Sequence, residues 1–397
     1  MRRTFLLVGL LLLFTIEILR VYFIMPFPGS QRSDTIGIAY FLDKNILWLR
    51  ILALVLVLPP LPYYFRKGRV WQKLSLTGLL LLYGLIFYFF NFRFLADKMF
   101  YQPKEKLFAG ATADTTNKDR LVIGVALNKE ARAYPIELIG YHHQVRDTVG
   151  GQPVMVTYCT VCRTGRVYSP FVKGQPESFR LVGMDHFNAM FEDTRTKSWW
   201  QQATGVAITG PLKGTRLAEI PSAQMSLGEW QALHPGSLTL QPDPNFKARY
   251  DSLKGYDEGV IKGSLERRDS GSWKFKSWVI GINMHGQSRA YDWNRLVNSR
   301  IIQDTIGHSP LLLTIHPDNK TFYALTHPDS LHFHYDSLTH LLKDENTQST
   351  WQVDGECTEG PLKGQRLVAV QAYQEFWHSW KTFHPTTPGE YPAFVTP

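Results

Sequence analysis

Cysteine is scarce in this chain, with three residues among 397. A domain held together by many disulfides is therefore excluded. The sequence also lacks the phosphate loop, the dinucleotide-binding glycine pattern, the HExxH zinc motif and the nucleophile elbow. The common signatures of nucleotide-binding proteins, zinc proteases and serine hydrolases thus assign no function here.

Most of the chain carries no excess of positive or negative charge. The formal net charge is +9, but residues 1–106 hold 14 Lys and Arg residues against 5 Asp and Glu residues. The rest holds 29 of each kind and is neutral. Because the surplus lies around the apolar N-terminal third, it indicates membrane orientation and not a polyanionic partner. A nucleic-acid partner is not expected.

Long apolar runs are confined to this N-terminal third. Three of them, at about 5–27, 46–65 and 74–92, each approach the ~20 residues that a helix needs to cross a bilayer. The first lacks a small-x-small cleavage site, so we interpret it as an uncleaved anchor. Residues 1–98 are therefore predicted to form a membrane domain of three transmembrane helices, with the lipid bilayer as a partner.

The orientation follows from one basic cluster. Arg66, Lys67, Arg69 and Lys73 lie between the second and third runs. The positive-inside rule places this loop and the N-terminus in the cytoplasm. Three crossings then export everything after the third run. We expect a multi-pass protein of the bacterial inner (cell) membrane with a periplasmic or extracellular C-terminal domain.

Self-comparison of the exported part indicates an internal repeat. The segments "VIGV" and "ARAYP" at 122–135 recur as "VIGI" and "SRAYD" at 279–292, and "GPLKGTRL" recurs as "GPLKGQRL". We interpret residues 107–243 as a first repeat and residues 262–397 as a second repeat, with 244–261 as a linker. Both show short apolar runs around Gly-rich turns and one short helical pattern, so the predicted fold is a tandem-duplicated, mainly β domain with short helices.

The first repeat carries a Cys-x-x-Cys pair in "TYCTVCRTGRVY", whereas the second repeat has His316 and Asn319 at the corresponding positions. This asymmetry predicts a site at Cys159 and Cys162 and a degenerate site in the second repeat. The pair follows one strand pattern and precedes another, a context typical of a metal-binding knuckle. A redox dithiol would more often begin a helix.

Three readings of the pair stay open. Two thiolates with an imidazole suit copper(I) or zinc(II), and His143 and His186 are the candidate additional ligands. Alternatively, the pair is a thiol–disulfide oxidoreductase centre for an exported partner protein. As a third reading, it is a structural disulfide in a non-catalytic scaffold. An exported redox or metal-delivery protein is the expected partner for the first two.

Polar residues near these positions are candidates for supporting roles. Asp193 and Arg195 have no counterpart at the place in the second repeat where Ser349 and Trp351 recur, so we expect them to be specific to the first site. With Asp147, Ser198 and Trp200 they form the predicted surroundings of the metal or redox site. Cys357, in the second repeat, is predicted to be a buried thiol and not a ligand.

The runs "HQVRDTVGGQPVMVTYCTVCRTGRVY" and "FEDTRTKSWWQQATGVAITGPLKGTRLAEIP" resemble the bacterial family of the domain of unknown function 3179. The resemblance covers about residues 107–397. It implies that the family's motif residues fall on His143, Asp147, Cys159, Cys162, Asp193, Thr196, Ser198 and Trp200. Thr160 and Arg163 replace the family's usual Pro and Gly within the knuckle. The resemblance implies no activity, and whether the chain is an enzyme stays open.

Overall fold

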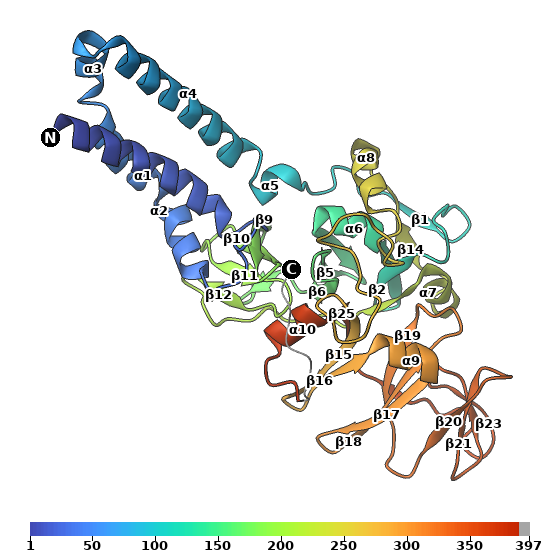
Figure 1. Cartoon of the computed structure of the whole chain (residues 1–397). Helices are drawn as coiled ribbons and strands as arrows, with labels where there is room; N and C mark the ends of the chain where they lie inside the picture. Colours follow the sequence, from blue (N-terminus) through green and yellow to red (C-terminus); the bar gives the residue numbers. More distant parts are fainter. Residues whose placement is uncertain (389–397) are drawn as a thin grey trace. The chain divides into compact units, whose positions relative to one another are not determined.

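A computed structural model describes residues 1–388, and its N-terminal part contains three long apolar helices (Figure 1). They are α1 (Arg2–Tyr22), α2 (Ile36–Val57) and α4 (Val70–Phe92), with the short helices α3 (Leu61–Lys67) and α5 (Ala96–Met99) after α2 and α4. Each long helix has the length and composition needed to cross a membrane. The three predicted long apolar helices are confirmed, although α2 begins at Ile36, ahead of the predicted start at 46.

The part of α2 that precedes the predicted start contains charged residues that form ion pairs. Asp43 lies 3.3 Å from the Nε atom of Arg20 on α1, and Lys44 forms an ion pair with Glu192. Further along α2, Arg50 makes a two-pronged pair with the fully buried Glu17 carboxylate, at 2.6 and 2.8 Å. Pairing of this kind removes much of the cost of holding charge within an apolar helix bundle.

Contacts divide the chain into two compact units. Unit 1 comprises Met1–Tyr101, Glu177–Gln201 and Val206–Arg216, and unit 2 comprises the remaining residues. The predicted repeat and linker boundaries differ from this division, and they stay a prediction. In unit 1, a four-stranded antiparallel sheet has the order β12-β11-β10-β9. Its strands are β9 (Phe179–Asp185), β10 (Asn188–Asp193), β11 (Trp199–Gln201) and β12 (Ala207–Thr209).

This sheet packs on the loop after α1 within unit 1. The Met184 amide donates a 2.7 Å hydrogen bond to the Ile24 carbonyl. The neighbouring Gly183 is required for this approach, because a Cβ atom there would lie 2.2 Å from the same carbonyl oxygen. The indole of Trp199 also packs edge-on against Tyr40 of α2.

Unit 2 is mainly β, with five sheets of three to five strands and one two-stranded ribbon. Its first-repeat strands are β1 (Phe108–Gly110), β2 (Leu121–Leu127), β3 (Glu130–Pro135), β4 (Gln144–Val149), β5 (Gln152–Cys159), β6 (Thr164–Tyr168), β7 (Phe171–Val172), β8 (Gln175–Pro176), β13 (Ala223–Ser226) and β14 (Leu238–Leu240), with helices α6 (Ile136–His142) and α7 (Leu227–Leu233). Its second-repeat strands are β15 (Trp278–Met284), β16 (Gln287–Asp292), β17 (Ile301–Ile306), β18 (Ser309–Ile315), β19 (Phe322–Thr326), β20 (Phe333–Asp336), β21 (Leu341–Asp344), β22 (Thr350–Trp351), β23 (Cys357–Glu359), β24 (Val368–Ala369) and β25 (Ala372–Phe376), with helices α9 (Trp293–Ser299) and α10 (Trp377–Phe383). The predicted fold class, apolar helices followed by a mainly β part with short helices, is confirmed.

The order of elements recurs along the chain, as the internal repeat predicts. The series β2-β3-α6-β4-β5-β6 returns as β15-β16-α9-β17-β18-β19, and β13-α7 returns as β25-α10. Equivalent close contacts recur as well, because a Cβ atom on Gly124 would lie 2.3 Å from the Trp230 indole and one on Gly281 would lie 2.0 Å from that of Trp380. Tandem duplication remains our interpretation of this recurrence.

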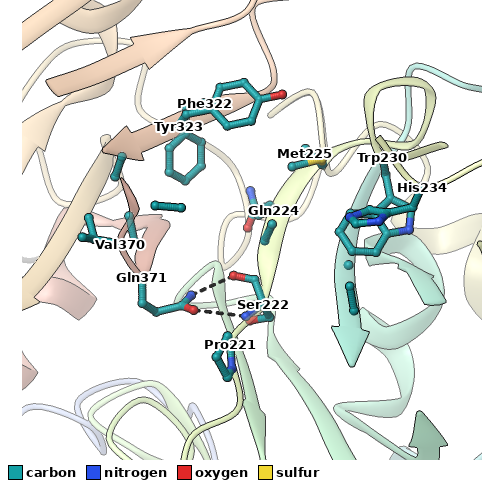
Figure 2. Close-up of a pocket in the computed structure, with 16 residues that line it drawn as sticks. Pro221, Ser222, Gln224, Met225, Trp230, His234, Phe322, Tyr323, Val370 and Gln371 are labelled. Carbon is teal, nitrogen blue, oxygen red and sulfur yellow. Dashed lines mark hydrogen bonds between the residues drawn. The ribbon is translucent and has the colours of Figure 1, made fainter. Parts of the chain in front are cut away.

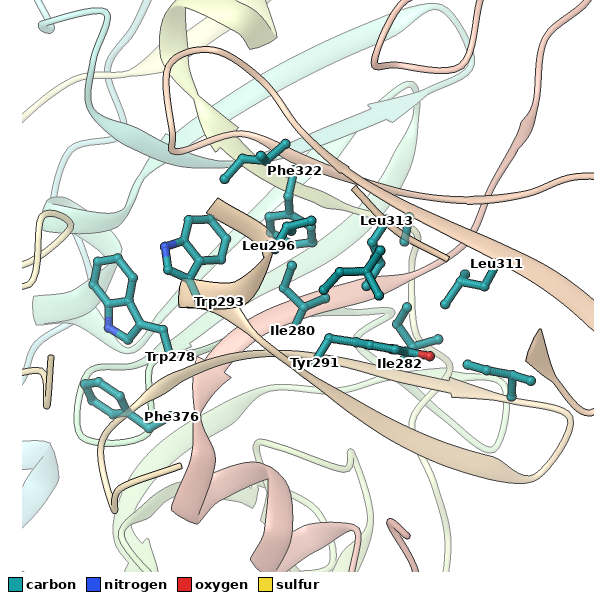
Figure 3. Close-up of a cluster of buried hydrophobic side chains, with 14 residues drawn as sticks. Trp278, Ile280, Ile282, Tyr291, Trp293, Leu296, Leu311, Leu313, Phe322 and Phe376 are labelled. Atoms are coloured by element: carbon teal, nitrogen blue, oxygen red, sulfur yellow. The ribbon is translucent and has the colours of Figure 1, made fainter. Parts of the chain in front are cut away.

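The core of the second repeat is aliphatic and aromatic. Ile280 and Ile282 of β15 pack with Trp293 and Leu296 of α9 and with Leu313 of β18 (Figure 3). The alternating inward residues of β15 meet the apolar face of a single short helix. Such burial is the main source of stability of this half.

The predicted linker is an ordered part of unit 2. It contains the 3-10 turns η1 (Pro244–Phe246) and η2 (Asp251–Leu253), with α8 (Lys247–Tyr250) between them. Its later residues Tyr256 and Asp257 are almost completely buried. The Tyr256 hydroxyl donates a 2.7 Å hydrogen bond to the Thr160 carbonyl, so this segment covers the turn that carries the two cysteines.

Candidate functional site

The cysteine pair lies at the turn between β5 and β6. Cys159 is the last residue of β5 and pairs in register with Thr164, the first residue of β6. Cys162 lies within the turn, and both side chains are completely buried. All three cysteines of the chain are free thiols in the structure. The predicted strand-turn-strand context of the pair is therefore correct.

Arg163 completes this turn in a conformation that usually favours glycine. Its φ is +57°, in the left-handed region. Its guanidinium donates hydrogen bonds to the Gln374 amide oxygen at 2.9 Å and to the carbonyls of Tyr256 and Asp257 at 3.2 and 3.0 Å. It also lies 3.8 Å from the ring centroid of Trp278. These contacts offset the backbone cost of placing arginine in this conformation.

The two thiols interact directly. Burial raises the pKa of the Cys162 thiol well above its usual value, and a hydrogen bond with the Cys159 thiol raises it further. Interaction with the Ser379 side chain acts in the opposite direction. At neutral pH the thiol of Cys162 is therefore protonated, and a reactive thiolate is rare.

The wall facing the thiols comes from the second repeat. The Phe376 amide donates a 2.9 Å hydrogen bond to the Cys162 carbonyl. The His378 ring contacts the Val161 carbonyl through Nε2 at 3.1 Å. Burial lowers the pKa of this imidazole to about 3, so it is neutral at pH 7. The thiol turn of the first repeat is thus held by the end of β25 and the start of α10.

Glu375, the residue before Phe376 in β25, forms a buried ion pair. The Arg166 guanidinium donates a 2.6 Å hydrogen bond to the Glu375 carboxylate, and both side chains are at most 2% exposed. The Ser379 hydroxyl donates to Glu375 at 2.7 Å and lies 3.1 Å from the hydroxyl of Thr164, the first residue of β6 after the thiol turn. Charge in the thiol site is therefore internally compensated.

The predicted histidine ligands do not assemble with the thiols into a metal-binding group. Within residues 1–388, no group of three or more His, Cys, Asp or Glu side chains is arranged to hold a metal ion. His143 is buried, its Nδ1 lies 3.2 Å from the Tyr141 carbonyl, and burial lowers its pKa to about 4. His186 belongs to unit 1, where Asp185, at 2.8 Å, raises its pKa.

Asp147 of β4 contacts residues of β3, a strand of the neighbouring sheet. Its carboxylate accepts hydrogen bonds of 2.7 Å from Arg132 and from the Tyr134 hydroxyl. In the second repeat, Asp304 accepts the equivalent 2.8 Å hydrogen bond from Tyr291. Because the second repeat keeps this pair without keeping the thiols, its contacts point to a structural role for Asp147.

Asp193 organises a tight loop in unit 1. Its carboxylate accepts hydrogen bonds from the Thr196 amide at 2.5 Å, from the Ser198 amide at 3.1 Å and from the Trp200 indole at 2.9 Å. The Ser198 hydroxyl accepts the Leu212 amide at 3.0 Å. These contacts close the loop between β10 and β11.

The expectation that Asp193 is specific to the first site is wrong. Asp344 builds the same loop in the second repeat, with the Thr347 amide at 2.6 Å and the Trp351 indole at 3.1 Å. The two loops align at an offset of 151 residues, whereas "VIGV" and "VIGI" lie 157 residues apart and "GPLKGTRL" and "GPLKGQRL" lie 150 residues apart. Arg195 is 54% exposed and contacts Glu177 at 3.5 Å.

The sequence did not predict that the turn of each repeat contacts the start of a helix in the other repeat. In the second repeat, the turn after β18 packs on the start of α7, where the Ser226 hydroxyl donates a 2.8 Å hydrogen bond to Asp318. The Ser226 amide donates to the Thr321 hydroxyl at 3.0 Å. The offset between "VIGV" and "VIGI" also pairs Thr164 with Thr321, and this correspondence was the signal in the sequence that the two turns are equivalent. Each turn is therefore held by the helix start of the other repeat.

Cys357 lies apart in the second repeat. It is buried within a cluster that includes Leu312, Phe333 and Trp351. Its thiol donates a 3.4 Å hydrogen bond to the Glu359 carbonyl. The prediction of a buried thiol is confirmed.

Comparison with known proteins identifies a family but no activity. Residues 104–387 match the family described as "Protein of unknown function (DUF3179)". No curated protein and no solved structure matches the chain.

Proposed function

The chain belongs to the DUF3179 family of proteins of unknown function, and we propose that it is a membrane-anchored exported protein whose Cys159 and Cys162 form a two-electron thiol–disulfide centre. The three apolar helices support the anchor. The basic residues of α3 and of the start of α4 support a cytoplasmic loop, which directs the mainly β part to the periplasmic or extracellular side.

The observation that carries the proposal is the placement of two completely buried thiols in the single turn between β5 and β6, where the Cys159 side chain raises the pKa of Cys162. Oxidation joins the two sulfur atoms, and two protons and two electrons pass to an oxidant such as a low-molecular-weight disulfide. An exported compartment favours the oxidised form. Because the thiols are enclosed, a small oxidant reaches them more readily than the thiolate of a partner protein. The geometry therefore favours an internal cross-link over exchange with a protein substrate.

The cross-link has a structural consequence in this proposal. It closes the turn between β5 and β6, the turn that is hydrogen-bonded to Phe376 and His378 of the second repeat. Formation of the disulfide restricts the unfolded chain and rigidifies this turn. The centre then acts as a redox-dependent lock on the junction between the two repeats.

Copper(I) binding is the second candidate function. Two adjacent sulfur atoms provide the soft ligands that copper(I) prefers. Zinc fits the site poorly, because its structural sites use four ligands and its catalytic sites three, and residues 1–388 present no such group around the thiols. Both thiols would have to lose their protons, which the raised pKa of Cys162 opposes.

Thiol counting with metal analysis separates these candidates. The full-length protein, purified in detergent without reductant, is compared with the Cys159→Ser/Cys162→Ser double variant and with Cys357→Ser. For the wild type denatured without reductant, we expect one thiol that reacts with maleimide. After reduction we expect three, and metal analysis should find no stoichiometric metal. The double variant keeps one thiol in both conditions. One copper per chain, lost in the double variant only, would favour the second candidate, and three free thiols without metal would reject both.

A further inference from the structure

A cavity of about 370 Å³ lies within unit 2, where strands of the two repeats meet (Figure 2). The first repeat contributes β2, β13 and its preceding residues, and the middle and C-cap of α7. The second repeat contributes β19 and the segment from β24 to β25. Its volume lies within the usual range for small-molecule sites. Neither repeat forms this cavity alone.

The lining carries no carboxylate, ammonium or guanidinium group. It consists of small and aliphatic residues, the aromatic side chains of Trp230, Phe322 and Tyr323, and neutral polar groups that include Gln224, His234 and Gln371. A charged ligand entering this cavity would lose hydration without gaining an ionic partner, which is unfavourable. The lining therefore selects for an uncharged ligand.

The aromatic and amide groups of the wall are held in place. The Tyr323 hydroxyl donates a 2.7 Å hydrogen bond to Glu229, which fixes the ring at one side of the cavity. The Gln371 amide exchanges two hydrogen bonds with the backbone of Ser222, at 2.9 and 3.1 Å, as Figure 2 shows. The Gln224 amide nitrogen donates to Gln374 at 2.8 Å. A preformed wall lowers the entropic cost of binding.

His234 differs from these groups. Its ring packs at a tilt against Trp230 with 4.2 Å between centroids, and its imidazole nitrogens make no hydrogen bond to another residue of the described part of the chain, 1–388. The equivalent His384 of the second repeat instead contacts the Trp380 carbonyl through Nδ1 at 3.2 Å. Burial lowers the pKa of the His234 imidazole, so at pH 7 the ring is neutral and offers one donor and one acceptor.

We propose that this cavity binds an uncharged, ring-bearing small molecule that packs against Tyr323 and the alkyl side chains and forms a hydrogen bond with His234. Aromatic and aliphatic walls favour a flat apolar ring. The imidazole supplies the polar contact that orients it. The site is independent of the thiol centre, because none of its lining residues belongs to the turn between β5 and β6.

Three probes with one ring system and different charges test the proposal. Binding of indole, indole-3-acetate and tryptamine to the full-length protein in lipid nanodiscs is measured by saturation-transfer NMR and calorimetry, with empty nanodiscs as the blank. We expect indole to bind at least tenfold more tightly than either charged analogue. Equal affinity for all three, or no indole binding beyond the blank, overturns the proposal.

Matched variants locate the binding. Ala126→Phe enlarges an exposed residue of the lining, and Asn283→Phe makes the same change at the equivalent exposed position of β15, outside the cavity. Ala126→Phe should weaken indole binding at least tenfold, and Asn283→Phe should leave it unchanged. His234→Phe should weaken it severalfold and His384→Phe should not. Unaltered binding to Ala126→Phe contradicts the assignment.

Discussion

The backbone amide of Phe376 donates a 2.9 Å hydrogen bond to the carbonyl of Cys162. A residue at the end of β25 therefore holds the turn that presents both thiols. The chemistry of the cysteine pair thus depends on a segment more than 200 residues further along the chain, in the repeat that has no cysteine pair. The second repeat is a structural part of the site.

Ser379 should tune the reactivity of the pair. Its hydroxyl hydrogen bond lowers the pKa of Cys162 against the larger raising effect of burial. Ser379→Ala removes a hydrogen bond worth about 1 kcal/mol, so oxidation of the pair by a small disulfide oxidant should slow roughly fivefold at pH 8. Ser299→Ala, which alters an exposed hydroxyl on α9, is the control. An unchanged or faster rate would remove Ser379 from this role.

The Arg166–Glu375 pair should be important for stability. Both partners are buried, and Glu375→Gln leaves the Arg166 charge with only the more distant and partly exposed Glu219, at 3.8 Å, as an ionic partner. Such a loss costs about 3 to 5 kcal/mol. In urea unfolding of the full chain, Glu356→Gln should cost less than about 1 kcal/mol, because its pair with Arg366 is exposed. Similar losses in the two variants would contradict the buried pair's importance.

His143 should make the fold sensitive to acid. Burial lowers its pKa from 6.5 to about 4. Between these values the unfolded chain binds a proton that the folded chain excludes, so stability falls as the pH drops from about 6.5 towards 4. His143→Asn should reduce the slope of this part of the stability profile, measured by urea unfolding from pH 4 to 7, and the buried His378, with its pKa lowered to about 3, should account for slope that remains. The exposed His334→Gln should retain the wild-type slope.

Two variants, each with one introduced exposed cysteine, report the membrane orientation. Lys67→Cys lies at the end of α3, and Leu338→Cys lies in a 91% exposed turn of the second repeat. A membrane-impermeant maleimide applied to cells with a permeabilised outer envelope should label Leu338→Cys and spare Lys67→Cys until the cells are lysed. The reverse pattern would invert the proposed topology.

The sequence predicted those parts of the fold that depend on local pattern. Apolar run length indicated three long helices, and alternation around Gly150 and Gly151 indicated the β4–β5 hairpin. The boundary of α2 was missed because Asp43 and Lys44 interrupt apolar character, although both find partners in the folded chain. Such partners are invisible to a hydropathy window.

The surroundings of the thiols were less predictable. The linker appeared to be a simple connection because it is polar, yet the Tyr256 and Asp257 carbonyls satisfy the Arg163 guanidinium. His143 lies close to the pair in sequence, but its ring contacts the Tyr141 carbonyl. Contacts between segments hundreds of residues apart leave no periodic signal, so the wall around the pair required the structure.

A redox titration of the purified full-length protein tests the central claim most directly. The wild type and the Cys159→Ser/Cys162→Ser variant are equilibrated in graded thiol–disulfide buffers, and the free thiols are counted by mass after alkylation in denaturant. We predict that two thiols disappear together in a single two-electron transition, with about 30 mV per tenfold change in ratio, and that the double variant shows none. Three thiols that remain free throughout the titration would contradict the thiol–disulfide centre.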